Sequence, residues 1–499
     1  RRDCQGFRAS RIWGGRHSGY RRVNPDPDAP VALQLGILLG YSIALVVFGL
    51  WVSRRVAGAD SFFVADRKLG PGLTFSTFLA ANIGAGSIIG ASGLGYTVGL
   101  SAWWFVGSAG IGSILLATWV GPRIWRVATK NSLYTAGDYR EHRYGSAVRA
   151  TIASLLWFAT LAILAAQLIA MSEILEWVLG APRWVGALMG GIVMTAYFCA
   201  GGLLTSAWVN VVQLVVLLVG FAIAVPLALS MAGGWQAVTA AAPTPEYLDI
   251  FSGSGLVFVA LIVPAFIISP GLLQKAYACR DERTLRIGIA AQGCVLLVFA
   301  FAPALLGMIA RVYDPALANP EFAVPTVLTL GLPTVFGALA LAAVFSAEVS
   351  SADTILFMLS TSLSKDIYKR YLAPEASDAQ VLKVARLAAL AGGGLAILLV
   401  FVIPTVIDSL TIFYSVMSVS LFVPIVVGLH SRRAGVPEAL AAIGVGVTVL
   451  IIVELSKRSG FPPWMASRWL DRTLLGILAS GAAFAIVQFI RRPTSQGAP

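Results

Sequence analysis

The sequence predicts an all-α polytopic membrane protein, on the strength of its composition and of the length of its apolar runs. Hydrophobic residues make up 58% of the 499 residues and charged residues only 12%, with a mean hydropathy of +0.81. A soluble domain carries about 25% charged residues. Apolar runs of about 20 residues recur along the chain, as bilayer-spanning helices require, whereas barrel strands are about ten residues long and alternate in polarity. A soluble enzyme, a nucleic-acid-binding protein and a disordered scaffold are therefore excluded.

Apolar stretches bounded by charges, Gly or Pro give about thirteen candidate transmembrane helices along the chain. They are expected to start near residues 31, 72, 101, 148, 184, 205, 253, 287, 333, 384, 408, 437 and 472. The basic segment 1–30 lacks the apolar core of a signal peptide, and we expect it to lie outside the fold. The main unit is expected over residues 31–430, and residues 431–499 add two further helices.

Lys and Arg residues are distributed unequally between the two sets of loops that these spans create. One set holds most of them, namely Arg54, Arg55, Arg67, Lys68, Arg123, Arg126, Lys130, Arg140, Arg143, Arg149, Lys275, Arg280, Arg283, Arg286, Lys365, Lys369, Arg370, Lys383, Arg386, Arg432, Arg433, Arg491 and Arg492. The other set holds only Arg183, Arg311, Lys457, Arg458, Arg468 and Arg472. Because basic loops stay cytoplasmic, we expect a plasma (inner) membrane protein with its amino terminus outside and its carboxyl terminus inside. The net charge of +12 then reflects topology rather than an acidic partner.

The residue types that several kinds of chemistry need are absent or scattered. The cysteines form no CxxC pair and the histidines lie in the tail or in loops, at Cys4, Cys199, Cys279, Cys294, His17, His142 and His430. No Walker loop occurs. We therefore expect no enzyme, no organic cofactor and no nucleic-acid partner. A transporter driven by an ion gradient is favoured over a channel, which needs a continuous polar pore, and over a membrane-embedded enzyme, which needs a nucleophile and a base.

The second span is rich in glycine, and we expect it to be unwound near the middle of the membrane. Residues 72–99 contain Gly84, Gly86, Gly90, Gly93, Gly95 and Gly99, and each glycine costs a helix interior about 1 kcal/mol relative to alanine. Unwinding over 82–87 exposes carbonyls to a cation and amides to an anionic group, as in discontinuous transporter helices. The alternative interpretation is that these glycines serve only close helix packing.

A second interruption is predicted in the seventh span, at Pro264 and at Pro270–Gly271, because proline removes a helix hydrogen bond and kinks the helix. Broken helices at corresponding places of two halves indicate a binding site between inverted repeats. The distance between the two breaks predicts five-helix repeats over 72–231 and 253–430.

In the ninth span, two carboxylates and several hydroxyls stand within an apolar run. Glu348 and Asp353 each cost a few kcal/mol in a membrane helix by insertion scales, so we expect them to face protein or water. Hydroxyls follow Ala347 at offsets of three or four along one helix face, at Ser350, Ser351 and Thr354. Such oxygen donors suit a hard cation such as Na⁺. The alternative is that the hydroxyls bond only to carbonyls of the preceding turn.

These motifs resemble the sodium:solute symporter family. The resemblance rests on residues 80–83, on Ala347-x-x-Ser350-Ser351, on 366–369, on 270–275 with Arg280-Asp281, and on Tyr134-x-x-Gly137-Asp138-Tyr139. It runs from about residue 35 to 430. It implies thirteen helices in a leucine-transporter-type inverted repeat, an outward amino terminus and alternating access. It also implies a sodium site formed by carbonyls of Ala80, Ile83 and Ala347 and hydroxyls of Ser350 and Ser351.

The sequence departs from the family pattern at Asn210, where many members carry an acidic residue. In relatives this acid is linked to a second sodium site or to the ion's exit path, with partners at the positions of Asp353 and Thr354. We hypothesise that the charge has moved across the site from position 210 to Asp353. Glu348 is interpreted either as a proton carrier or as a packed carboxyl, which keeps a proton-coupled transporter as an alternative.

The solute is expected to be a small organic molecule held near the break. The expected binding residues are Asn82, Gly84, Gly86, Ser87, Trp103 and Phe413. Sugar-transporting relatives have Gln at the position of Ser87 and Glu at that of Val106, so the resemblance ranks sugars below monocarboxylates, amino acids such as proline, and pantothenate. Choline-like cations are the alternative, with aromatic faces from Trp103, Trp104, Phe413 and Tyr414, unless those rings face lipid or the core. A monomer in the bilayer suffices for this function.

Overall fold

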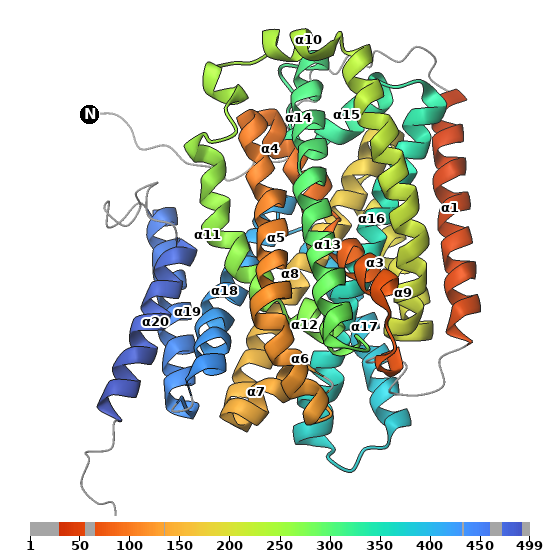
Figure 1. Ribbon diagram of the computed structural model, residues 1–499. Coiled ribbons are helices and arrows are strands. Elements are labelled where there is room, and N and C mark those ends of the chain that lie inside the picture. The colour runs from red at the N-terminus through yellow and green to blue at the C-terminus, as the bar shows by residue number, and fades with distance from the viewer. Residues whose placement is uncertain (1–28, 55–64, 134, 432–433, 460–471, 492–499) are drawn as a thin grey trace, which may run out of the picture.

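The structure, a computed structural model, describes residues 29–54, 65–133, 135–431, 434–459 and 472–491. In this part of the chain every regular element is a helix, and one isolated bridge pairs Leu69 with Cys279 (Figure 1). The all-α prediction is therefore confirmed. Some residues used in the sequence analysis lie outside the described ranges, namely those of the tail before 29 and Arg55, Tyr134, Arg432, Arg433, Arg468 and Arg492.

The helices follow one another with short connections. The first half contains α1 (Ala29–Ser53), η1 (Ala65–Arg67), α3 (Pro71–Asn82), η2 (Gly86–Gly90), α4 (Ala91–Val98), η3 (Gly99–Ala102), α5 (Trp103–Leu115), η4 (Leu116–Val120), α6 (Gly121–Lys130), α7 (Ala136–Tyr144), α8 (Ser146–Leu179), α9 (Arg183–Met231) and α10 (Gly234–Ala240). The second half contains η5 (Pro245–Leu248), α11 (Gly253–Ile268), α12 (Pro270–Tyr277), α13 (Glu282–Phe299), α14 (Phe301–Tyr313), η6 (Pro320–Phe322), α15 (Ala323–Leu330), α16 (Thr334–Thr361), η7 (Ser362–Leu372), α17 (Asp378–Leu399), α18 (Val406–His430), α19 (Val436–Ser459) and α20 (Arg472–Ile490).

Within the described residues, 11 helical stretches are long and apolar enough to cross a membrane. Two features account for the difference from the thirteen spans predicted. The end of the second predicted span and the whole third span form one stretch, Gly86–Lys130, and the spans predicted near 184 and 205 both lie in α9, where Leu203–Met231 qualifies. The count of thirteen is thus not confirmed, although each predicted start lies in a helix or next to one.

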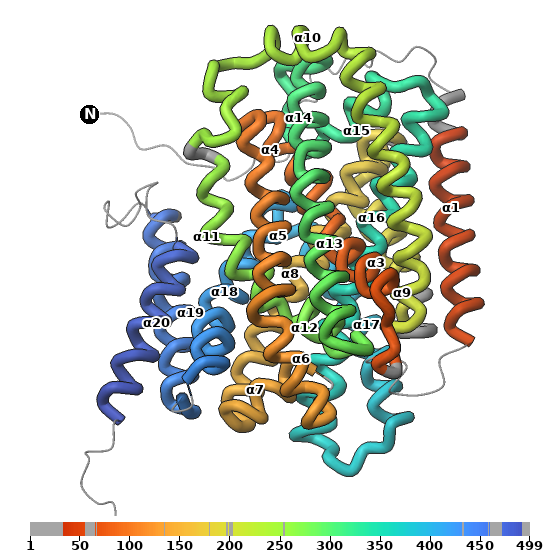
Figure 2. The backbone as a smooth tube through the Cα atoms, in the orientation of Figure 1, coloured from red at the N-terminus to blue at the C-terminus, as the bar shows by residue number. Residues whose placement is uncertain are grey.

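The centre of the molecule is formed by α8 and α16, which are buried along most of their membrane-spanning windows, 78% and 83% respectively. α16 packs against α9, α8, α1, α17 and α3. α1 stands at one edge of the molecule and α19 and α20 stand together at the opposite edge, beside α18 (Figure 1, Figure 2). Polar side chains on α16 are therefore shielded from lipid, as the carboxylates of that helix require.

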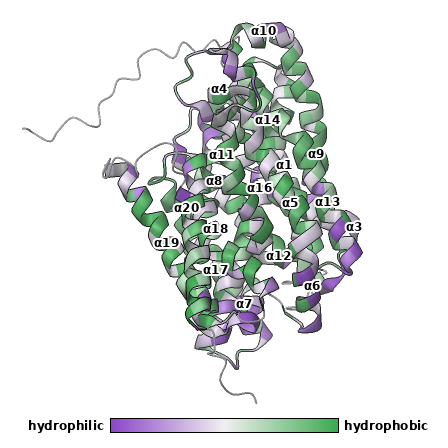
Figure 3. Ribbon diagram, turned by 60° about the vertical axis from the view of Figure 1, so that its left-hand side comes forward, coloured by the Kyte–Doolittle hydropathy of each residue, from purple (hydrophilic) through white to green (hydrophobic). Residues whose placement is uncertain are grey.

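Large apolar side chains are exposed on the outer helices, where Figure 3 shows mostly hydrophobic ribbon. They include Ile43, Val47, Val215, Val219, Leu387, Leu390, Ile452, Leu455, Leu478 and Ile486. Exposed apolar bands of this kind suit contact with lipid tails, which offer no hydrogen-bond partners.

Charged residues gather at the end of the molecule that carries α6 and α7 (Figure 3). There Arg149 pairs with Asp138 at 2.9 Å, Glu141 at 2.6 Å and Asp366 at 2.7 Å. Burial alone raises the pKa of Glu141, but hydrogen bonds from Arg149 and Arg370 hold this pKa below its usual value. Two segments that carry the family resemblance, 137–139 and 366–369, thus meet in one ion-pair network.

Candidate functional site

The second predicted span is interrupted where the glycines predicted it. α3 ends at Asn82, and Ile83 has extended backbone, with φ −108° and ψ 107°. Helical structure resumes at Gly86, in η2, and continues in α4. The carbonyls that precede the break and the amides that follow it therefore lack regular helical partners, and side chains are needed to satisfy them.

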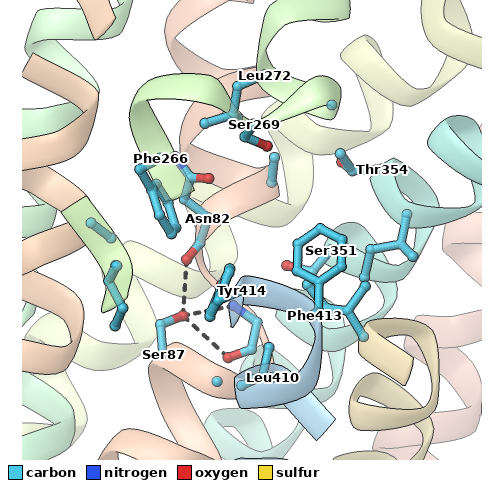
Figure 4. A pocket seen from close by; sticks show the side chains of 18 of the residues that line it. Asn82, Ser87, Phe266, Ser269, Leu272, Ser351, Thr354, Leu410, Phe413 and Tyr414 are labelled. Carbon is cyan, nitrogen blue, oxygen red and sulfur yellow. Dashed lines mark hydrogen bonds between the residues drawn. The ribbon is translucent and has the colours of Figure 1, made fainter. Parts of the chain in front are cut away.

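Two polar side chains stabilise this break. The amide of Gly84 donates to Ser87 Oγ at 2.8 Å, and Ser87 Oγ donates to the carbonyl of Asn82 at 3.0 Å (Figure 4). The amide of Ala85 donates to Oε1 of Gln167, on α8, at 3.0 Å. These hydrogen bonds fix the unwound segment to its own chain and to α8.

The carbonyls of the break converge on the hydroxyl strip of α16. Ser351 Oγ lies 3.1 Å from the carbonyl oxygen of Ala80 and 2.8 Å from that of Ile83. These are three of the five residues that the family resemblance assigned to a sodium site. Gly84 leaves the room for this approach, because a Cβ there would lie 2.2 Å from Ser351 Oγ.

The two remaining residues of that set lie close by, in different surroundings. Ser350 Oγ donates to Oδ1 of Asn210, on α9, at 2.8 Å. Ala347 is buried one helical turn before Ser351. Carbonyl and hydroxyl oxygens of an unwound helix and its neighbour are the donor set that transporters offer to Na⁺, so the residues present fit this ion.

A cavity of about 760 Å³, including the part open to solvent, lies beside the break (Figure 4). Its polar lining residues are Asn82, Ser87, Gln167, Ser269, Ser351, Thr354 and Tyr414. The apolar side chains around it include Phe105, Val106, Ile262, Phe266, Leu272, Ile355, Met358, Leu410, Phe413 and Met417. None of the residues that line it carries a formal charge.

The second predicted interruption faces the same cavity. Pro264 lies inside α11 and does not end it; the helix ends at Ile268, and α12 begins with Pro270 after the non-helical Ser269. Ser269 and Gly271 line the cavity together with Gly84 and Gly86. The two broken helices thus meet across one space, as the sequence predicted.

Of the predicted solute-binding residues, Asn82, Gly84, Gly86, Ser87 and Phe413 line the cavity. Trp103 does not: its Nε1 donates to the carbonyl of Leu297 at 3.0 Å, and its ring packs against Phe301. Trp104 does not line the cavity either: its Nε1 donates to the carbonyl of Ile250 at 2.7 Å. Gln167 was not predicted, although an amide within the long apolar run of α8 is a signal that could have indicated it.

The residues predicted for a second ion or proton site separate into different environments. Asn210 bonds to Ser350, whereas Thr354 accepts a hydrogen bond from Lys275 Nζ at 2.8 Å. The sequence predicts a loop position for Lys275, whereas the structure places it in α12, fully buried. Asp353 and Glu348 are also buried in α16. The Asp353 carboxylate interacts with the hydroxyl of Ser206, on α9, whereas neither carboxylate oxygen of Glu348 has a hydrogen-bond partner within the described residues.

Comparison with known proteins agrees with this arrangement. The sodium/glucose cotransporter of Vibrio parahaemolyticus is 26% identical over 391 residues, which cover 70% of this chain and 71% of that protein. The sodium/pantothenate symporter of Escherichia coli (strain K12) is 27% identical over 467 residues, which cover 88% of this chain and 95% of that protein.

The fold agrees as well. The structure of a Na⁺-coupled sialic acid symporter in a substrate-bound outward-open state matches with a TM-score of 0.78 at 20% sequence identity, over 93% of this chain and 99% of that one. The predicted leucine-transporter-type architecture is thereby confirmed. The sequence profile of the sodium:solute symporter family matches residues 62–446. The chain therefore belongs to the sodium:solute symporter family.

Proposed function

We propose that this protein couples inward movement of Na⁺ to uptake of a small organic solute by alternating access. The observation that carries the proposal is the convergence of the Ala80 and Ile83 carbonyls with the Ser351 hydroxyl, beside an uncharged cavity. Na⁺ bound there, with Ala347 and Ser350 completing the site, ties α3 to α16. Coupling follows if the outward-open and inward-open states bind the ion unequally.

The cavity favours a solute that needs no charged partner from a side chain. Asn82, Gln167 and Ser269 offer neutral hydrogen bonds, and the amino end of α12 points its partial positive charge toward the same space. A carboxylate fits such a place, while the apolar lining accommodates the rest of the molecule. Small monocarboxylates, amino acids such as proline, and pantothenate-like acids therefore rank above sugars, which need many polar partners.

A quaternary amine of the choline type is the second candidate, because four aromatic rings line the cavity at Phe105, Phe266, Phe413 and Tyr414. The faces of such rings attract cations. Phe266 and Tyr414 lie with ring centroids 5.8 Å apart, and Phe413 and Tyr414 with centroids 5.5 Å apart. Phe413 and Tyr414 are the two predicted rings that line the cavity, and Phe105 and Phe266 take the places expected for Trp103 and Trp104.

The proposal includes an orientation in the inner membrane. The ion-pair network around α7 and Arg149 lies at the end of the molecule where α20 also ends, and α1 begins at the opposite end (Figure 1). By the positive-inside rule the α7 end faces the cytoplasm. We propose inverted repeats over 72–231 and 253–430, with α19 and α20 as additions outside them.

A thermal-unfolding screen of the detergent-purified protein tests the function. Carboxylates, amino acids, quaternary amines and sugars are added singly in NaCl or in KCl, since a ligand that binds only the folded state raises the melting temperature. We expect a carboxylate or amino acid to shift the melt in NaCl alone. Equal shifts in both salts contradict sodium coupling, and a shift by quaternary amines alone identifies the second candidate.

A further inference from the structure

Lys275 joins three helices at a point next to the candidate site. Its side chain is fully buried in α12. Its Nζ donates to the carbonyl of Thr77, on α3, at 2.9 Å and to Thr354 Oγ1, on α16, at 2.8 Å. It also interacts electrostatically with the neighbouring buried carboxylate of Asp353. Because Thr354 lines the cavity, the ammonium lies directly behind the cavity wall.

Oxygen atoms surround this ammonium, and some of them could accept further hydrogen bonds or bind a cation. Thr77 Oγ1 lacks a hydrogen-bond partner within the described residues, and the buried Asp353 carboxylate has only the Ser206 hydroxyl and the Lys275 ammonium to interact with. Carbonyl, hydroxyl and carboxylate oxygens are also the ligands of small hard cations. A buried charge is costly unless it is paired, so the Asp353 carboxylate needs a positive charge, and in this chain Lys275 supplies it.

We propose that the Lys275 ammonium is a built-in cation that fills the polar site between α3, α12 and α16, so that the protein binds a single Na⁺, at Ser351, in each cycle. The inference rests on the proposed sodium coupling and specifies its stoichiometry. It also changes the interpretation of Asp353. This carboxylate is the counter-ion of a lysine that stays in the protein, and it does not serve as a ligand for a second transported ion.

Radioactive ²²Na⁺ binding to the purified full-length protein counts the ions directly. Lys275→Met removes the charge and keeps an unbranched apolar chain, which leaves Asp353 and the Thr77 and Thr354 oxygens available. We expect one ion per chain in the unmodified protein and two in Lys275→Met, with the Hill coefficient for Na⁺ rising from about 1 to about 2. Lys275→Met/Asp353→Asn, which removes both charges, returns to one ion. The matched control Lys68→Met, at an exposed position, keeps one ion.

Every other result of the ²²Na⁺ binding measurements either contradicts the inference or supports it. Two ions in the unmodified protein overturn it, and so does a folded Lys275→Met that still binds one. If Lys275→Met is unstable, purification in NaCl and in choline chloride decides: rescue by NaCl alone supports the inference, and failure in both salts overturns it. Absence of Na⁺ from the unmodified protein contradicts the proposed function instead; in that case an ion gained by Lys275→Met still supports the cation role of Lys275, and no gain overturns it.

Discussion

Ser351 is the side chain in which the sequence motif and the three-dimensional arrangement coincide most directly. Its hydroxyl reaches both carbonyls at the end of α3, so one oxygen links the broken helix to the central α16. Ser346 stands five residues earlier on the same helix, and its Oγ instead lies 2.6 Å from the hydroxyl of Tyr41. Both serines lie on α16, but only Ser351 contacts the carbonyls of the break, so Ser346 is a matched control for Ser351.

Ser351→Ala is expected to weaken Na⁺ binding at least about tenfold, which corresponds to about 1.4 kcal/mol, because one of the proposed ligands of the ion is lost. The concentration of Na⁺ needed for half of the melting-temperature shift measures this. Ser346→Ala is the control and is expected to leave that concentration unchanged. Equal sodium dependence of the two variants contradicts the assignment of Ser351.

Gly84→Ala is expected to abolish the sodium-dependent shift. An added Cβ would lie 2.2 Å from Ser351 Oγ and 2.8 Å from Gln167 Oε1. Contacts this short force the break apart from α16 and displace Gln167 from the amide of Ala85. In Gly444→Ala, on α19, the added methyl group meets nothing within 4 Å. That control is expected to bind Na⁺ normally and to melt at or slightly above the original temperature, since alanine favours a helix. A normal sodium response in Gly84→Ala contradicts the geometry.

At the level of the elements, the glycines of the second span satisfy both interpretations of the sequence, at different positions. Gly84 lies in the break, whereas Gly95 lies where α4 packs on α14, with a Cβ position only 2.5 Å from the carbonyl oxygen of Ala304. Composition predicts that such a span is unusual, but it does not separate the two roles, because both need the absence of a side chain.

The start of α18 is held by a buried carboxyl from another element. Glu321, in η6, accepts hydrogen bonds from the amides of Val406 at 3.1 Å and Ile407 at 3.3 Å. A negative charge at a helix amino terminus is favourable. Burial nevertheless raises the pKa of Glu321 above its usual value, against the lowering effect of those amides, and the neighbouring carboxyl of Glu173 is also buried.

This raised pKa predicts how stability depends on pH. Between the ordinary pKa of about 4.5 and the raised folded-state pKa, the folded protein binds more protons at Glu321 than the unfolded chain does, so stability falls as pH rises through that interval. Glu321→Gln replaces the carboxyl group with an amide that cannot ionise. We therefore expect it to remove the part of the fall in stability that Glu321 causes. The melting temperature of Glu321→Gln is therefore expected to fall less as pH rises through that interval than the melting temperature of the unmodified protein does.

Melting curves recorded from pH 4 upward provide the measurement, and the exposed Glu246→Gln serves as the control. A pH profile of Glu321→Gln that runs parallel to that of the control contradicts a raised pKa at Glu321.

At the scale of the whole molecule, the sequence was most informative where one physical constraint dominates. Bilayer thickness determines the length of apolar runs, so the helical class follows from hydropathy. The cluster of glycines around position 84 indicates a break because glycine weakens a helix interior. Lys275 was misassigned because a charge near the end of an apolar run resembles a loop residue until its partners Thr77 and Thr354 are known. Trp103 was expected at the cavity, but its direction depends on packing against α13 and α14, which no local pattern records.

The net charge that crosses the membrane in each transport cycle depends on the charge of the solute and on the number of Na⁺ ions that move with it. A membrane potential contributes about 2.3 kcal/mol per elementary charge per 100 mV. With Lys275 remaining in the protein and one Na⁺ moving, a zwitterionic solute such as proline carries one net positive charge inward, and a monocarboxylate carries none. In proteoliposomes with an inward Na⁺ gradient, an inside-negative potential of about 100 mV is therefore expected to raise equilibrium accumulation of a zwitterion roughly 40- to 50-fold and that of a monocarboxylate hardly at all. Ser351→Ala, assayed in parallel, reports any leak that does not depend on the sodium site. Potential-driven accumulation of a monocarboxylate requires a second moving cation, and that result contradicts a cycle in which one Na⁺ is the only cation that moves.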